Sequence, residues 1–319
     1  MSNDPLAIGV DLGATKIATA LVARDGTVVA SRHAPTLPDE GFERVCQRIA
    51  AEVAQLVVGR RADGILAVGV GSAGLVDGDA GVVRWAVNLG WKDVPLAAEV
   101  ARRLDHALPV FADNDANANA LGEGFFGSAR GCRHYALFTI GSGLGSVLVR
   151  DGRVVNGTLG MVSNLGHYAL DPDSGAPCPC GRRGCAETIV SGPALCAATR
   201  AILAAGERSS MLIDDGNLTS DHIVAAARAG DAVAMLAITK MSRVLGEVAS
   251  VAAAVLGPEV IILGGGLGAA AADLLEPGVT RELSRRLPIP QAIPPVRAAT
   301  LKSSAVGAAC IVWSRAATS

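Results

Sequence analysis

The chain has 319 residues, of which 50% are hydrophobic and 18% are charged, and its formal net charge is −2. It is therefore long enough for two globular domains and too apolar to be disordered. This charge gives no electrostatic reason to expect a nucleic-acid partner, and residues 260–272 are too glycine-rich and short to span a membrane. Seven cysteines and a polar start without a signal peptide predict a cytoplasmic, reducing compartment.

Two similar strand meanders are predicted. Residues 6–10, 17–22 and 27–31 read as three strands joined by glycine turns. Residues 135–140, 145–149 and 151–155 read as a second copy, and Asp151-Gly152 mirrors Asp25-Gly26. A pair of such copies predicts a duplicated, two-domain architecture.

Helical patterns fill the intervals between the strands. Apolar residues recur at helical spacing in residues 42–59, 96–104 and 115–123, and the last of these follows a short strand at 109–112. Residues 193–256 are alanine-rich and almost wholly helical in pattern, with Asp221 and Asp231 placed as N-caps or first-turn acids. A buried strand at 260–263 and a helix at 305–313 complete an α/β protein.

Three glycine-rich turns could together wrap a nucleotide. The segment Asp11–Lys16 lies between two strands, where Gly13 permits close approach to a phosphate, Thr15 and Lys16 offer donors, and Asp11 could hold Mg²⁺ through water. An ordinary acidic hairpin turn is the alternative. The segment 141–145, with Gly141, Ser142 and Gly143, occupies the equivalent turn of the second copy. The segment 264–268, with Gly264, Gly265 and Gly266, joins a strand to a helix.

A run of acidic and amide residues, 113–118, lies at the end of a strand and the start of a helix. Asp113 or Asn114 could serve only as an N-cap. Phosphoryl transfer to a hydroxyl needs a carboxylate that orients the hydroxyl and takes its proton. Asp115 is the candidate for that base.

A cluster of soft ligands follows in the second half. His167, Cys178, Cys180 and Cys185 offer an imidazole and three thiolates, the ligands that close a tetrahedral zinc site. A loop that is merely rich in cysteine is the alternative. His167 and Glu187 lie near the two ends of this cluster, so a metal could hold both rigidly beside a substrate.

Taken together, these segments resemble the ROK family (repressors, open reading frames and sugar kinases), especially its glucokinase-like members. The resemblance implies the actin-like ATPase (ribonuclease H-like) fold, a duplicated two-domain sugar kinase that closes on ATP and sugar, often as a homodimer or homotetramer. Residues 1–113 with 303–319 are then the smaller α/β domain, and residues 114–302 are the larger one with the zinc-binding loop. The motifs that carry the resemblance are Asp11–Lys16, Gly69–Gly74, Asn88–Trp91, Asn114–Asn117, the turn at Gly141, and Cys178–Glu187.

The resemblance also implies roles for individual residues. Asp115 is the catalytic base, and the first two glycine turns hold phosphates while the third contacts the adenosine portion of ATP. The zinc is structural, and its ligands are His167 and the three cysteines. The residues expected to contact the sugar are Gly74, Asn88, Asn114, Asp115, Asn164, His167 and Glu187.

Two positions depart from the family pattern. Where glucose kinases of the family usually read Gly-Glu-x-Gly-His, this chain reads Ser163-Asn164-Leu165-Gly166-His167, and Ala73 stands where a proline commonly precedes the glycine. Asparagine is uncharged and can donate as well as accept, so the sugar held could differ. The expected function is an ATP-dependent kinase of the primary (6-) hydroxyl of a hexose, and the alternative is one specific for an amino sugar, N-acylhexosamine or carba-sugar.

A second class of function is a sugar-sensing regulator, which the same family contains. Those members carry a helix-turn-helix domain ahead of the first glycine turn, whereas the first predicted strand begins at Leu6. We therefore expect no nucleic-acid or membrane partner. A sensor without DNA contact stays open as the lesser alternative.

Overall fold

The computed structural model describes residues 5–58, 64–158, 163–212 and 216–316, and within them the chain is the mixed α/β protein that the sequence predicts. Its contacts define two compact units. Residues 1–131, 152–162 and 301–319 form the first unit, and residues 132–151 and 163–300 form the second. The first unit therefore extends past the expected boundary at residue 113, because the helix that follows Asn114 packs against the last helix of the chain.

The first unit is built on a five-stranded sheet with the order β3-β2-β1-β4-β8. β1 is antiparallel to β2, which is antiparallel to β3, so the predicted meander is confirmed. β1, β4 and β8 are mutually parallel neighbours, so their carboxyl ends meet at one edge. The strands are β1 (Leu6–Leu12), β2 (Lys16–Ala23), β3 (Val28–Pro35), β4 (Ile65–Ser72) and β8 (Val110–Asn114).

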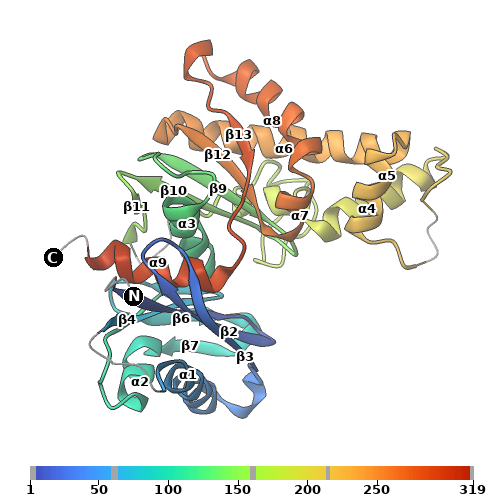
Figure 1. Ribbon diagram of the computed structural model, residues 1–319. Coiled ribbons are helices and arrows are strands. Elements are labelled where there is room, and N and C mark those ends of the chain that lie inside the picture. The colour runs from blue at the N-terminus through green and yellow to red at the C-terminus, as the bar shows by residue number, and fades with distance from the viewer. Residues whose placement is uncertain (1–4, 59–63, 159–162, 213–215, 317–319) are drawn as a thin grey trace. The chain divides into compact units, whose positions relative to one another are not determined.

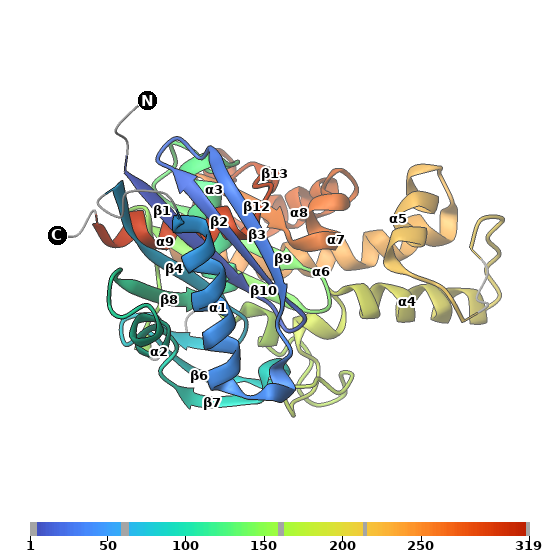
Figure 2. The same ribbon diagram turned by 60° about the horizontal axis from the view of Figure 1, so that its bottom comes forward.

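Helices cover both faces of this sheet. α1 (Phe42–Val57) and α2 (Leu96–Arg103) share a buried core with the β1 side chains of Ile8, Val10 and Leu12, and Figure 2 shows α1 lying across that face. α3 (Asp115–Phe126) and α9 (Ser304–Ala316) cover the other face (Figure 1). α9 approaches closely because two strand positions are glycine: a Cβ at Gly9 would lie 1.8 Å from the carbonyl oxygen of Ala305, and one at Gly69 would lie 2.1 Å from that of Ala308.

A smaller antiparallel sheet extends the first unit. It consists of β5 (Leu75–Asp77), β6 (Val82–Ala86) and β7 (Trp91–Val94), with the 3-10 turn η3 (Val87–Leu89) between the last two. Val76, Val83 and Trp91 are buried in the same core as α1 and α2. A further 3-10 turn, η1 (Pro38–Glu40), precedes α1.

The second unit repeats the central topology of the first. β9 (Tyr135–Ile140) is antiparallel to β10 (Leu144–Arg150) and parallel to β12 (Val260–Gly264), which is parallel to β13 (Val296–Ala298). This is the arrangement of β1, β2, β4 and β8, so the predicted duplication is confirmed. The third strand of the second copy, predicted at 151–155, is only the two-residue β11 (Arg153–Val154).

In the described part of the second unit, five α-helices accompany the sheet, and the segment predicted as almost wholly helical contains three of them. They are α4 (Gly192–Ala204), α5 (Ser220–Arg228), α6 (Ala232–Leu256), α7 (Gly265–Ala270) and α8 (Ala272–Arg286), and the 3-10 turn η7 (Pro290–Ala292) follows α8. Asp231 is the N-cap of α6, whereas Asp221 is a first-turn acid of α5. No single helix in the described ranges is long and apolar enough to span a membrane; α5 and α6 qualify only as a pair, which bends by 110°.

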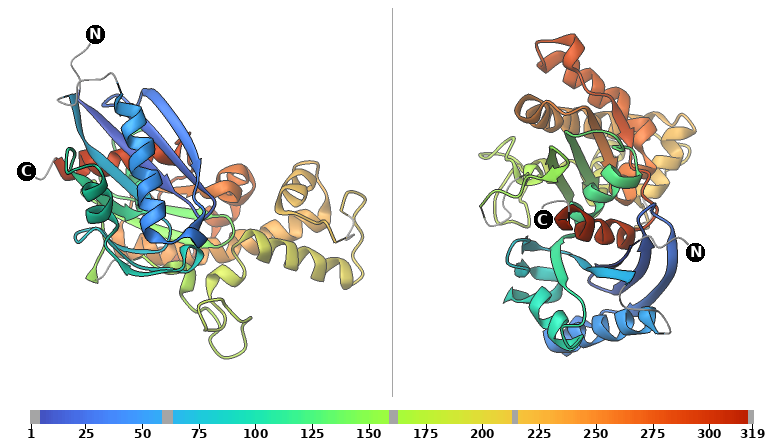
Figure 3. Two further views of the ribbon diagram at one scale, coloured as in Figure 1. Left: turned by 90° about the horizontal axis from the view of Figure 1, so that it is seen from below. Right: turned by 60° about the vertical axis from the view of Figure 1, so that its left-hand side comes forward.

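Residues 163–191 of the second unit, which we call the cysteine loop, contain little regular structure. Their elements are the 3-10 turns η5 (Leu165–His167) and η6 (Ala186–Thr188) and isolated bridges that join Ala169 to Cys185 and Pro177 to Arg183. The cysteine loop is the yellow-green segment that precedes α4 in Figure 3.

Candidate active site and metal loop

The first glycine turn is shorter than the sequence suggested. Asp11 is part of β1 and Lys16 begins β2, so the turn proper is Gly13–Thr15. The Gly13 N–H donates to the carbonyl of Lys16 at 3.0 Å and closes the turn. Among the described residues, the N–H groups of Ala14 and Thr15 have no hydrogen-bond partner. Consecutive free N–H groups in a turn form a concavity that suits an anion.

Asp11 lies at the shared carboxyl edge of the three parallel strands. The register places Asp11 beside Gly71 of β4, and Gly71 beside Asp113 of β8. Burial, assisted by the negative charge of Asp115, raises the pKa of Asp11 from 3.8 to about 6, against the opposing effect of Lys16. The fold thus brings two predicted site carboxylates, Asp11 and Asp115, close enough to interact.

The junction of β8 and α3 positions Asp115. Asn114 is the N-cap of α3, and its side-chain oxygen accepts from the N–H groups of Ala116 at 2.9 Å and Asn117 at 3.3 Å. Asp115 is therefore the first residue of the helix, and burial raises the pKa of its carboxyl group. A carboxyl group with a raised pKa accepts a proton more readily than an ordinary aspartate does.

Asp113 stabilises the junction of β8 and α3 through hydrogen bonds. It is buried, and one carboxylate oxygen accepts from the Asn114 N–H and from the side-chain amide of Asn117, both at 2.7 Å. The sequence offered Asp113 as an alternative N-cap, but the cap is Asn114. Its amide also donates to the carbonyl of Gly74 at 2.8 Å.

The remaining predicted sugar residues of the first unit lie around the small sheet. Gly74 has a φ of +104°, and a Cβ there would be 2.4 Å from the carbonyl oxygen of Trp85, so this position requires glycine. Asn88 is exposed on η3 and makes no hydrogen bond with the described residues. A hydrogen bond thus joins Gly74 to Asn114, whereas the described residues show no such bond from Asn88 to either of them.

The second glycine turn, Gly141–Gly143, joins β9 to β10 and closes like the first. The Gly141 N–H donates to the carbonyl of Gly143 at 3.0 Å, and within the described ranges the N–H groups of Ser142 and Gly143 find no partner. Glu187 braces this turn, because one of its carboxylate oxygens accepts from the Leu144 N–H at 2.9 Å. A Cβ at Gly143 would lie 2.4 Å from that same oxygen, so a larger residue would displace it.

The third glycine turn lies at the end of β12, beside the second. Gly264 is opposite Thr139 in the register of β12 with β9. Gly265 begins α7 with a φ of +74°, and a Cβ there would be 2.5 Å from the carbonyl oxygen of Ile140. Gly266 follows in the first turn of α7, with open space where a Cβ would be. The second unit therefore gathers both of its predicted nucleotide turns at one edge of its sheet.

The cysteine loop brings its four predicted metal ligands together. One ligand atom from each of His167, Cys178, Cys180 and Cys185 lies within 4.8 Å of the others. The Sγ atoms of Cys180 and Cys185 are 3.7 Å apart, and Sγ of Cys178 is 3.5 Å from Nδ1 of His167. Tetrahedral zinc bonds imply about 3.8 Å between two sulfurs and about 3.5 Å between sulfur and nitrogen. The donor set and its spacing thus fit zinc.

Backbone hydrogen bonds give the cysteine loop its shape. The Gly181 N–H donates to the Cys178 carbonyl at 3.0 Å, and the Cys178 N–H donates to the Arg182 carbonyl at 2.8 Å. Gly184 has a φ of +66°, and a Cβ there would lie 1.8 Å from the carbonyl oxygen of Asp171. Only glycine fits at this crossing, which places Cys185 opposite Cys178 and Cys180.

Asn164, the position that departs from the family pattern, is exposed at the start of η5. Its carbonyl accepts from the His167 N–H at 3.1 Å, and its side chain caps nothing in η5. Ser163 has a φ of +68°, and its backbone and hydroxyl are held by Ser146 and by the Leu148 N–H. The backbone is therefore fixed at Asn164 while its amide stays open to a ligand.

Three side chains form supporting hydrogen bonds that the sequence does not predict. Thr36 donates to the Gly13 carbonyl in the first turn, Ser146 accepts from the Leu165 N–H at the start of η5, and Glu187 accepts from the Leu144 N–H after the second turn. Thr36 and Ser146 act from positions remote in sequence, and nothing in their local motif marks them. The resemblance implies Glu187 as a sugar ligand, but no local motif marks its bond to Leu144.

The chain is similar in sequence and in structure to proteins of one family. The model of the ROK family matches residues 7–315. A glucokinase of Streptomyces coelicolor is 36% identical over 278 residues, which cover 85% of this chain and 85% of that protein. The crystal structure of a ROK family glucokinase from Streptomyces griseus in complex with glucose and AMPPNP has a TM-score of 0.77 at 33% identity and covers 95% of this chain and 98% of that one.

A regulator of the same family is also similar in structure. The crystal structure of a ROK family transcriptional regulator, described as a homologue of the Escherichia coli MLC protein, has a TM-score of 0.85 at 27% identity, with 96% of this chain and 77% of that one covered. These structural matches confirm the actin-like ATPase fold that the sequence predicted.

Proposed function

Because the chain belongs to the ROK family, we propose that it is a sugar kinase, glucokinase-like, that transfers the terminal phosphoryl group of ATP to the primary (6-) hydroxyl of a hexose. The observation that carries the proposal is the Asp115 carboxyl group, fixed at the start of α3 with a raised pKa. The similarity to glucokinases supports ATP and a hexose as the two substrates.

Asp115 is the proposed catalytic base. Its carboxylate orients the hydroxyl of the sugar and takes its proton as the hydroxyl oxygen attacks phosphorus. The turn N–H groups of Ala14 and Thr15, and of Ser142 and Gly143, are the proposed donors to the phosphate oxygens. Fixed donors of this kind stabilise transferred charge without rearranging during the reaction.

Asp11 is the proposed magnesium residue. A carboxylate suits Mg²⁺, which prefers oxygen ligands and usually retains several waters, and contact through water is consistent with the position of Asp11 at the end of β1. When bound, the ion neutralises phosphate charge. Lys16, whose positive charge already lowers the pKa of Asp11, is a second cationic group at this turn.

Zinc in the cysteine loop is proposed to be structural, and to set the hydrogen-bonding state of His167. The Nδ1 atom of His167 faces Sγ of Cys178, so Nδ1 is the metal ligand and Nε2 carries the remaining proton. Nε2 can then donate to a sugar oxygen. Glu187 can accept from the sugar through lone pairs that its bond to Leu144 leaves free.

Asn114, Asn88, Gly74 and Asn164 complete the proposed sugar site. Asn114 uses its oxygen for the helix cap and one N–H for Gly74, so its second N–H is the group left to donate to a sugar. Asn164 favours a second candidate substrate. Its exposed side-chain amide makes no cap hydrogen bond and lies where glucose kinases of the family usually have glutamate. An amide can donate as well as accept, which suits an amino sugar, an N-acylhexosamine or a carba-sugar.

The test is ADP release across a panel of hexoses, amino sugars, N-acylhexosamines and cyclitols, with the phosphorylated product identified by its added mass. Turnover with a hexose supports the first candidate, and turnover confined to a modified sugar supports the second. Asp115→Ala should abolish turnover. Asp231→Ala, which also removes an aspartate from a helix start but lies at α6, should lose stability and keep turnover.

The regulator remains the competing class, because a ROK regulator shares the fold. A sensor would bind sugar without releasing ADP. Sugar binding in calorimetry with no turnover on any panel member would therefore contradict the kinase proposal. We also propose a homodimer or homotetramer, which light scattering on the purified protein would test.

A further inference from the structure

Thr36 is fully buried at the point where β3 leaves the sheet, directly against the first glycine turn. Its hydroxyl donates to the carbonyl of Gly13 at 2.7 Å, and its backbone N–H donates to the carbonyl of Thr15 at 3.0 Å. One residue thus bonds both ends of the turn. Buried polar groups that are fully hydrogen-bonded hold their partners in a single arrangement.

These bonds leave the turn little freedom to rotate. The carbonyls of Gly13 and Thr15 are bound by Thr36, and the carbonyl of Lys16 is bound by the Gly13 N–H. The carbonyls of Gly13 and Thr15 are therefore directed to protein donors, while the N–H groups of Ala14 and Thr15 stay without a partner in the described part of the chain. Those two N–H groups are the proposed anion donors of the turn. The bond from Thr36 to the Gly13 carbonyl fixes the peptide plane that carries the Ala14 N–H, and its bond to the Thr15 carbonyl fixes the Thr15–Lys16 plane, so the plane that carries the Thr15 N–H is held on both sides.

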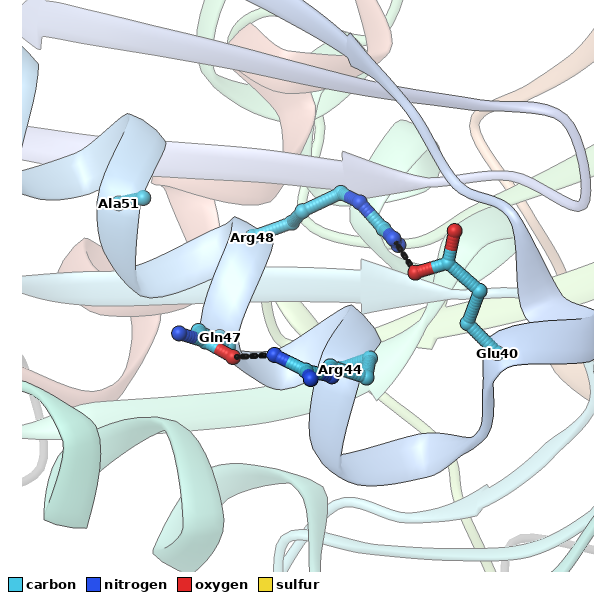
Figure 4. A pocket seen from close by; sticks show the side chains of 5 residues that line it. All are labelled: Glu40, Arg44, Gln47, Arg48 and Ala51. Atoms are coloured by element: carbon cyan, nitrogen blue, oxygen red, sulfur yellow. Dashed lines mark hydrogen bonds and ion pairs between the residues drawn. The ribbon is translucent and has the colours of Figure 1, made fainter.

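Thr36 is itself held from α1. Arg48 donates from its guanidinium to the Thr36 carbonyl at 2.6 Å, and it forms an ion pair with Glu40. Figure 4 shows the Arg48–Glu40 pair and the neighbouring Arg44–Gln47 hydrogen bond. The two arginines line an open hollow, but both already have protein partners, so we assign this group to support of Thr36 rather than to a ligand.

We propose that Thr36 is a positioning residue for the phosphates of the nucleotide, with Arg48 and Glu40 as its outer support. This proposal rests on the proposed kinase function. It predicts a selective defect, because Thr36 bonds the phosphate turn and none of the residues proposed to hold the sugar. A purely structural threonine would instead lower stability and leave the nucleotide interaction unchanged.

The test compares Thr36→Val with Thr36→Ser and with Thr19→Val. Valine keeps the branched shape and the backbone N–H but removes the hydroxyl bond to Gly13. Thr19, in β2, is a matched control, because it is also buried and its hydroxyl donates to a carbonyl, that of Arg32 at 3.4 Å. Thr36→Val should raise KM for ATP about tenfold, the size expected for one lost hydrogen bond, with KM for the sugar unchanged.

The serine variant should restore KM for ATP to near the wild-type value, because serine can remake the bond. The Thr19→Val variant should leave both KM values unchanged. The proposal is overturned if Thr36→Val raises both KM values together, or if it behaves like Thr19→Val. If Thr36→Val does not fold, Arg48→Met takes its place. It should raise KM for ATP and leave KM for the sugar unchanged. A KM for ATP equal to that of the wild-type protein would overturn the proposal.

Failure of the kinase function would be seen separately. If the wild-type protein turns over no sugar, magnesium and AMPPNP binding is measured by calorimetry on the same variants. About tenfold weaker binding in Thr36→Val than in Thr19→Val would support the positioning role without catalysis. Equal binding in the two variants, or no nucleotide binding by the wild-type protein, would overturn it.

Discussion

Replacing Gly184 with alanine should cost the protein most of its zinc affinity, whereas the same change at Gly181 should cost little. Both glycines have positive φ, +66° and +86°, so alanine at either carries about 1 kcal/mol of backbone strain. The two sites differ in space. A Cβ at 184 would lie 1.8 Å from the Asp171 carbonyl oxygen, whereas one at 181 would meet nothing within 4 Å.

The clash at 184 must be relieved by moving the backbone that closes the cysteine loop. Two hydrogen bonds of 2.8 Å cross there, from Leu170 to the Gly184 carbonyl and from Gly184 to the Ala176 carbonyl. Losing both adds about 2 kcal/mol to the strain, so the total of about 3 kcal/mol corresponds to roughly 100-fold in zinc affinity. Gly181→Ala should lose only about fivefold, from strain alone.

The assay is competition for zinc with a chromogenic chelator, together with the number of zinc ions per chain by elemental analysis. Equal zinc affinities of Gly184→Ala and Gly181→Ala would refute the idea that the contact with the Asp171 carbonyl requires glycine at position 184. A freshly purified wild-type protein without zinc would refute the metal site itself. Neither readout depends on enzymatic turnover.

Four further outcomes are expected. The pH dependence of kcat/KM should show an acid limb near pH 6, because burial raises the pKa of Asp11 to about 6 and also raises the pKa of Asp115, and both are proposed to act as carboxylates; a profile flat down to pH 5 would contradict this. The same raised pKa means that Asp11 favours folding most below its ordinary value of 3.8 and that this contribution disappears as the pH rises through about 6, so Asp11→Asn should weaken the pH dependence of thermal unfolding between these values. Asn164→Glu should shift the ranking of sugars in the ADP-release assay toward glucose by roughly tenfold to a hundredfold, and an unchanged ranking would show that this position does not select the substrate. Gly69→Ala should lower the free energy of unfolding in urea by more than about 2 kcal/mol, because the added Cβ would lie 2.1 Å from the Ala308 carbonyl oxygen; a smaller loss would mean that α9 can move away at little cost.

Features with a local chemical signature could be predicted from the sequence. The glycine turns, the Asp231 cap and the cluster of four candidate metal ligands all follow from residue types at short spacing, and the structure contains the turns and the cap and brings the four side chains together. The residues at which strands and turns begin and end are harder to predict from the sequence. Asp11 belongs to β1 rather than to the turn, because strand pairing with β2 and β4 continues to Leu12.

Features that depend on distant contacts could not be predicted. β5 has only three residues and the register of β5 with β6 shifts between Leu75 and Val76, so the alternation that would mark a strand is missing. The same limit applies to α3, whose pattern predicts a helix but not the unit to which it belongs. That assignment depends on packing against α9, which comes much later in the chain.

The dependence of the first unit on α9 also bears on how the chain folds during synthesis. Glu123, in α3, accepts a hydrogen bond from the Leu301 N–H, 178 positions later, and Gly9 of β1 and Gly69 of β4 lie against α9. The ribosome therefore completes all of the second unit before the first can close its core. We expect the second unit to fold early, while the part of the first unit's sheet that α9 covers stays exposed. A chaperone that binds apolar surfaces would act in this period.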